Sequence, residues 1–251
     1  MVEDTNSRST DRRTVLTTVG TAFVGLAAGV GSVAAKSESS AKAAGIHTAV
    51  QRLLHNGNHR QARRLLEKHD IAHDVERRRM PSVGHDEHKG DISKQDQWTK
   101  SESKFSHTSW RKAGDVYHSL AQWDLEKIGE WETDGPKDAV GITFNPDLWE
   151  IVNGSWDFDD QSSLAKRGQK GIIVEYDDPR KKDELADTTG WASIDYEKTE
   201  AGNHNVYGTY CHTWVPLGIP GWVSFSLSAG PIGVSTSGRV DTWKKRADNN
   251  L

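Results

Sequence analysis

The chain has 251 residues, of which 34% are hydrophobic and 27% are charged, and its formal net charge is −4 at pH 7. This composition is ordinary for a soluble protein and excludes a fibrous repeat or a chain of many membrane spans. The single cysteine excludes an internal disulfide, so packing, polar contacts or a metal must hold the fold together.

Residues 1–35 have the layout of a secretory signal. Arg12 and Arg13 precede an uncharged apolar run, Val15 to Ala35, that ends in small residues. The arginine pair, followed by one residue and then two hydrophobic ones, resembles the twin-arginine export signal. This resemblance implies that the twin-arginine export machinery recognises Arg12 and Arg13, and that the protein folds before it crosses the membrane. We expect the run to be cleaved; the alternative is a retained anchor, since the run is about long enough to span a bilayer.

The signal and the general style of the chain resemble exported proteins of halophilic archaea. The net charge of −4 departs from the large acidic excess that is usual for halophilic proteins. The resemblance implies a secreted or cell-surface location and implies nothing about activity.

Residues 36–80 form the basic part of the chain, with ten Lys and Arg against five Asp and Glu. Apolar residues at helical spacing on both sides of an Asn-Gly-Asn break at residues 56–58 predict a helical hairpin. Each apolar stripe is too small to fold alone, so the hairpin must dock on another part of the protein. We interpret its basic face as solvated, or as docked on the acidic remainder of the chain. A nucleic-acid site is not expected in an exported protein.

Residues 81–109 are polar, without periodicity, and are predicted to be a linker between domains. His85, Asp86 and His88 supply donors suitable for zinc or copper. Ordering a flexible segment opposes such binding, so this metal site is a candidate only. The arginines before Met80 allow a further alternative, in which the basic segment is the removable pro-region of a secreted effector or toxin-like precursor.

Residues 110–251 change to period-two patterns, which predict an antiparallel β-domain. The fold class is therefore α+β, mainly β: a β-sandwich or flattened barrel preceded by the helical hairpin and the signal segment. All ten tryptophans lie at or after Trp98, which places the core in this part of the chain. The predicted strands lie within residues 115–125, 138–145, 171–178, 190–198, 205–217, 222–230 and 232–243.

The stretch from residue 222 to 240 has the clearest alternation. Val223, Phe225 and Leu227 are predicted to face the core, and Ser224, Ser226 and Ser228 to lie on a hydroxyl-rich face. After a turn at Gly230 and Pro231, the apolar face is predicted to continue with Val234, Thr236 and Val240. We interpret that face either as a well-hydrated surface or as a flat contact surface.

The stretch from residue 206 to 214 holds the only cysteine beside a histidine. In an extended strand Cys211 and His212 point to opposite faces, so they cannot form a nucleophile–base pair with each other. We predict that Cys211 is a small buried residue. Tyr210, His212 and Trp214 share the other face, either as core or as a platform on which a ligand stacks, and core packing is favoured.

The sequence favours a non-enzymatic binding or cell-envelope interaction module, whose partner would be an envelope glycan or a surface protein. The alternative is an extracellular hydrolase with acid and base from aspartates and from His118, His204 or His212. The sequence contains no phosphate loop, dinucleotide fingerprint or serine elbow, and it does not identify a cofactor.

Overall fold

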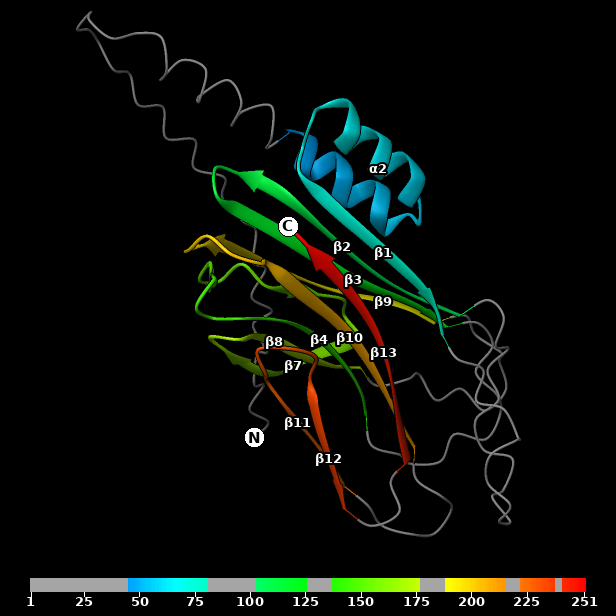
Figure 1. Cartoon of the computed structure of the whole chain (residues 1–251). Helices are drawn as coiled ribbons and strands as arrows, with labels where there is room; N and C mark the ends of the chain where they lie inside the picture. The colour runs from blue at the N-terminus through cyan, green and yellow to red at the C-terminus, as the bar shows by residue number, and fades with distance from the viewer. Residues whose placement is uncertain (1–44, 81–102, 126–136, 177–187, 215–221, 238–240) are drawn as a thin grey trace, which may run out of the picture.

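The computed structural model describes residues 45–80, 103–125, 137–176, 188–214, 222–237 and 241–251. They form a helical hairpin, two large antiparallel sheets and a two-stranded ribbon (Figure 1). The strands are β1 (His73–Arg79), β2 (Lys104–Ala113), β3 (Val116–Leu125), β4 (Asp138–Phe144), β5 (Trp149–Ile151), β6 (Asp157–Phe158), β7 (Ser162–Gly168), β8 (Gly171–Tyr176), β9 (Thr188–Lys198), β10 (Asn205–Trp214), β11 (Trp222–Ser226), β12 (Gly233–Ser237) and β13 (Asp241–Asn250).

The predicted antiparallel β-sandwich is confirmed. The first sheet has the order β1-β2-β3-β9-β5, with β6 also paired to β9, and the second has the order β13-β10-β4-β8-β7. The sheets do not close into a barrel, so of the two predicted architectures the sandwich is the one formed. Each of the seven predicted strand regions overlaps an observed strand.

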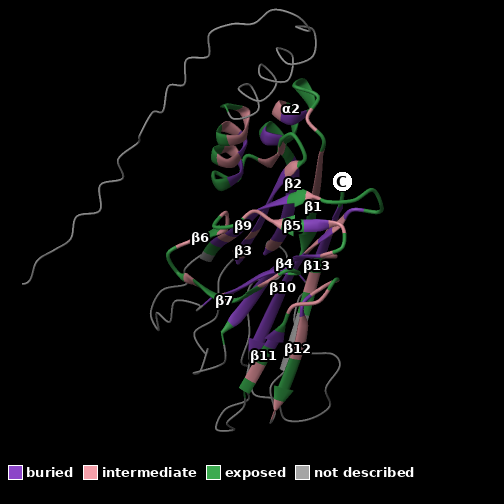
Figure 2. Ribbon diagram, turned by 90° about the vertical axis from the view of Figure 1, so that its left-hand side faces the viewer, coloured by how far each residue is buried: buried purple, intermediate pink, exposed green. Residues whose placement is uncertain are grey.

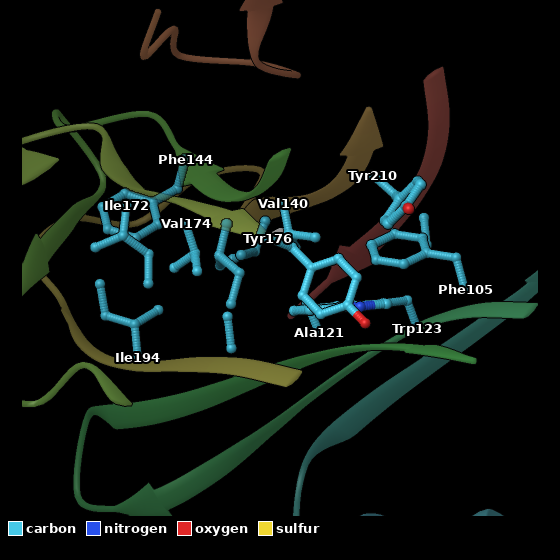
Figure 3. Packing of buried hydrophobic residues seen from close by; sticks show 14 of the residues in the cluster. Phe105, Ala121, Trp123, Val140, Phe144, Ile172, Val174, Tyr176, Ile194 and Tyr210 are labelled. Carbon is cyan, nitrogen blue, oxygen red and sulfur yellow. The ribbon is translucent and has the colours of Figure 1, made fainter. Parts of the chain in front are cut away.

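A large aromatic and aliphatic core fills the space between the two sheets (Figure 3). The first sheet contributes residues such as Trp123 and Ile194, and the second contributes Ile172, Tyr176 and Tyr210; all are at most 1% exposed. The ring of Trp123 contacts Tyr176 edge-on at a centroid distance of 5.2 Å. Burial of aromatic side chains on this scale is the dominant stabilising term in a chain without a disulfide.

The helical hairpin covers the outer face of the first sheet. Residues 45–55 and α2 (His59–Lys68) are helical and are joined by a break at which Gly57 has φ 69°, a conformation that glycine adopts without strain. The apolar stripes bury Leu54 and Leu66 against Trp110 and Leu120 of the sheet. The helical hairpin is thus formed as predicted, and its interface with the first sheet buries both apolar stripes.

β5, β6 and β7 lie outside the predicted strand regions, and two further strands lie in segments that were interpreted differently. β1 falls within the segment interpreted as the basic hairpin, and β2 begins at Lys104, inside the segment interpreted as linker. β1 is a polar edge strand, HDVERRR, and its position is fixed by pairing with β2 and by side chains. Asp74 Oδ2 accepts the backbone N–H of Asn250 at 2.9 Å, and Glu76 accepts that of Asp248. The segment that ends at Met80 therefore shares the core of the β-domain, which does not favour a removable pro-region.

The β11–β12 ribbon covers the outer face of the second sheet. Phe225 and Ile232 pack with Ala139, Ile173 and Cys211 of that sheet. A side chain on Gly141 would collide with Ile232, because a Cβ atom there would lie 2.1 Å from Ile232 Cγ2. With both of its faces covered, β4 is buried along its whole length (Figure 2).

The signal segment, residues 1–35, and the candidate metal-binding residues His85, Asp86 and His88 lie outside the described residues. Among the helices that are described, none has the length and apolar character needed to cross a membrane.

Candidate functional site

Tyr210 and His212 lie in the interior of the sandwich, 0% and 2% exposed. Both rings therefore pack in the core, which was the favoured interpretation, and neither is presented to solvent as a platform. The side chain of Trp214, the third member of the proposed platform, lies outside the described part of the chain.

These two residues belong to a buried polar network centred on Asp138, a residue that the sequence did not single out. Asp138 is 3% exposed at the start of β4, beside the end of β10. Its Oδ2 atom accepts hydrogen bonds from the Tyr210 hydroxyl and from His212 Nδ1, the latter at 2.9 Å, and its Oδ1 atom accepts the Thr213 N–H at 2.9 Å. Three donors from one strand thus converge on a single carboxyl group, as expected for a buried acid that the fold requires.

Cys211 is buried with the ribbon on the opposite face of β10, as the strand parity predicted. Its Sγ atom contacts the carbonyl oxygen of His212 at 3.8 Å, and burial raises the pKa of the thiol to about 12. A thiol of this kind is almost wholly protonated at neutral pH, so it lacks the activation that a catalytic cysteine needs.

A second polar cluster lies under the helical hairpin, on the outer face of the first sheet. His118 Nδ1 donates to Asp195 Oδ1 at 2.5 Å, and Lys112 Nζ donates to Asp195 Oδ2 at 2.6 Å. From the hairpin, Gln51 Nε2 lies 3.3 Å from His118 Nε2, and the ring of His47 lies edge-on to His118 at 4.8 Å. The cluster therefore joins the first helix to three strands of the sheet.

Burial sets the charge states in this cluster. Burial lowers the pKa of His118, and burial together with the neighbouring His118 lowers that of His47 to about 3. Burial alone would raise the pKa of Asp195, but the hydrogen bonds from His118 and Lys112 lower it below its usual range. At neutral pH the cluster thus holds an ionised Asp195 paired with Lys112, next to neutral histidines.

The three histidines named for a hydrolase are all buried. His118, His204 and His212 are 3%, 2% and 2% exposed. His204 is engaged by the carbonyl oxygen of Glu200 at 2.6 Å and packs edge-on against Trp149. Within the described ranges no three His, Cys, Asp or Glu residues are grouped so as to hold a metal ion. These histidines pack in the interior and form hydrogen bonds there, and none of the three is exposed at the surface.

A separate feature of the protein surface is the outer face of the β11–β12 ribbon. The predicted alternation is confirmed in β11, because Phe225 is 4% exposed and packs inward with Val223 and Leu227, while Ser224 and Ser226 are exposed. In β12 the prediction is wrong for Thr236, which is exposed although it lies opposite Val223. Trp222 shares the parity of these serines and is 57% exposed. We call this surface the hydroxyl face; it consists of Trp222, Ser224 and Ser226 on β11 and their cross-strand neighbours Ser235 and Ser237 on β12.

The neutrality of the hydroxyl face follows from the sequence. No residue between 222 and 237 carries a charged side chain. Gly233 lies opposite Ser226 and leaves room for it, because a Cβ atom on Gly233 would lie 2.3 Å from Ser226 Oγ. The ribbon is tied to the second sheet by Lys244 Nζ, which donates to the Ile232 carbonyl at 3.0 Å. The face is therefore a fixed, uncharged strip of hydroxyl groups with one exposed indole at its end.

No protein-family model and no curated protein matches the sequence. Among solved structures, the pilus backbone protein RrgB from Streptococcus pneumoniae matches with 10% identity and a TM-score of 0.30, over 72% of this chain and 50% of that chain. The full-length major pilin RrgB matches with 11% identity and a TM-score of 0.27, over 72% and 38%. This chain thus spans half or less of the length of those proteins. At this level of similarity, neither function nor assembly transfers to the chain.

Proposed function

We propose that this protein is an exported binding module of the cell envelope and that the hydroxyl face binds a neutral glycan. The observation that carries the proposal is the exposure of Trp222, 57%, at the end of a strip of serine hydroxyl groups. Of the large hydrophobic side chains that are described, the other exposed one is Leu164, at 37%. An exposed indole is costly to keep in water, and aromatic side chains of this kind are concentrated at binding surfaces.

The chemistry of the face fits a sugar. A pyranose ring has an apolar face that packs flat on an indole, and its rim carries hydroxyl groups that both donate and accept hydrogen bonds. Serine hydroxyls also donate and accept, so they match such a rim without a fixed polarity. The absence of charge between residues 222 and 237 argues for a neutral ligand, since a charged one would find no counter-charge on the strip.

The test replaces Trp222 by alanine and measures binding to a panel of neutral oligosaccharides, including glucans, mannans and chitin oligomers, by calorimetry. We expect at least one of them to bind the wild-type protein. Removal of an aromatic side chain that anchors a ligand costs about 2 kcal/mol or more, so the Trp222→Ala variant should bind it about thirtyfold more weakly. Leu164→Ala, on strand β7, is the matched control and should leave the affinity unchanged. Failure of every neutral glycan to bind, or equal affinity of the two variants, would count against the proposal.

Export itself is the second part of the proposal and depends on Arg12 and Arg13. If the twin-arginine machinery recognises this pair, replacing both residues by lysine should leave the folded protein inside the cell. Arg8→Lys, which alters an arginine outside the pair, is the control and should be exported normally. Cell fractionation followed by immunoblotting measures the distribution, and normal export of the double variant would exclude the twin-arginine route.

A further inference from the structure

The solvent side of α2 carries an aligned row of positive charges. Arg60, Arg64 and Lys68 follow one another at intervals of four residues, and all three are exposed. Residues four apart lie on one side of a helix, so the three cations form a single line, which we call the basic stripe. Ala62 and Leu66, on the opposite side of the helix, are buried against the sheet. The docking of the hairpin therefore turns the basic stripe away from the β-domain.

The residues of the basic stripe form no ion pair within the described part of the chain. The ion pair that α2 makes there joins Arg63 to Glu67, at 2.8 Å, and leaves the three stripe residues outside it. Like charges four residues apart destabilise a helix, and the first turn of α2 has no acidic residue to offset them. Of the two alternatives for the basic face, solvation is the one observed for these three residues, because the apolar side of the helix makes the contact with the sheet. The three cations are therefore open to a partner outside the chain.

We propose that the basic stripe contacts anionic lipid headgroups at a membrane surface. Clusters of lysine and arginine on an amphipathic helix close to an apolar segment are the kind of sequence that anionic lipids attract. In the alternative in which the apolar run from Val15 to Ala35 is retained as an anchor, nine residues separate it from the helical residue 45. Nine residues span at most about 30 Å, so a membrane that holds the run lies within reach of α2.

Contact of the basic stripe with lipid would also orient the whole molecule. The helices cover the outer face of the first sheet and the β11–β12 ribbon covers the outer face of the second, so the basic stripe and the hydroxyl face lie on opposite sides of the sandwich (Figures 1 and 2). A molecule held on lipid by the stripe thus presents its hydroxyl face away from the membrane. The two surfaces share no residue, so lipid binding by the stripe and glycan binding by the hydroxyl face can be tested separately.

The test compares co-sedimentation of the exported protein with two kinds of vesicle: phosphatidylcholine alone, and equal parts of phosphatidylcholine and phosphatidylglycerol. The protein should prefer the anionic vesicles, and the preference should fall as salt is added, because added salt screens surface charges. Each cation near an anionic surface is worth about a fivefold change in partitioning, so the triple variant Arg60→Gln, Arg64→Gln, Lys68→Gln should bind roughly a hundredfold more weakly.

Lys137, Lys166 and Lys170 provide the matched control, since they are equally exposed but lie on or beside strands of the second sheet. Changing all three to glutamine removes the same charge and should lower the partitioning far less. Equal binding to both kinds of vesicle, or an equal loss in the two triple variants, would overturn the proposal. So would binding of a short DNA duplex or an acidic polysaccharide through the stripe without binding to anionic vesicles. Oligosaccharide binding by the stripe variant should remain at the wild-type level, which separates this proposal from that for the hydroxyl face.

Discussion

Replacing Asp138 by alanine should lower the free energy of unfolding by about 3–5 kcal/mol, because three buried hydrogen bonds to one side chain are lost at about 1–3 kcal/mol each. The carboxyl group is 3% exposed and accepts hydrogen bonds from the Tyr210 hydroxyl, the His212 ring and the Thr213 N–H. Without it, these donors lose a common acceptor in the interior of the protein, and the loss of each buried hydrogen bond lowers stability.

The experiment is denaturant unfolding followed by tryptophan fluorescence. Asp160→Ala is the control, because Asp160 is exposed in a turn, and a change of less than about 0.5 kcal/mol is expected for it. Asp138→Asn should fall between the two, since an amide oxygen can still accept from Thr213. Equal stability of Asp138→Ala and Asp160→Ala would mean that the network does not hold this end of the sandwich.

The sandwich was predictable because its central strands have strong local signals. β4, β8 and β10 are rich in β-branched and aromatic residues and are bounded by turn residues, which is the pattern of half-buried or buried strands. β1 and β13 lack this pattern. Their sequences, HDVERRR and DTWKKRADNN, are polar edge strands whose positions are determined by partners far away in the chain, such as β2 and β10. A window of local sequence carries no information about such pairing.

The surface features were partly predictable for the same reason. The alternation in β11 predicted the hydroxyl face, and the basic residues of α2 predicted a basic face on the helix. Parity also gave the placement of Cys211 and His212 on opposite sides of β10. The networks around Asp138 and Asp195 were not predictable, because their members lie about 75 residues apart and meet only through strand register. The exposure of Trp222 likewise depends on which side of the ribbon the second sheet covers.

A last expectation concerns His107, which lies in the sandwich interior and is 0% exposed. Its Nδ1 atom donates to the Ala247 carbonyl at 3.1 Å, and Gly208 packs so closely under the ring that a Cβ atom there would lie 2.7 Å from it. Burial lowers the pKa of His107 to about 4, against weaker raising effects of the Ala247 carbonyl and of Asp248 and Asp74. The ring is therefore neutral in the folded protein at pH values where it is charged in the unfolded chain.

The direction of the pH effect follows from proton binding. Between pH 6.5 and about 4 the unfolded chain binds a proton at His107 that the folded protein does not, so this contribution is fully present above pH 6.5 and is lost as the pH falls. At about 1.4 kcal/mol per pKa unit, the loss attributable to His107 is roughly 3 kcal/mol. Urea unfolding at pH 7.5 and pH 4.5 should show a smaller difference between the two pH values for His107→Gln than for the wild type. His69→Gln, which changes an exposed histidine, should leave the difference intact. Because His107→Gln also alters packing, the ring protons of His107 in the wild-type protein provide a second reading by NMR; a titration midpoint near pH 6.5 in the folded state would contradict the prediction whatever the stability of the variant.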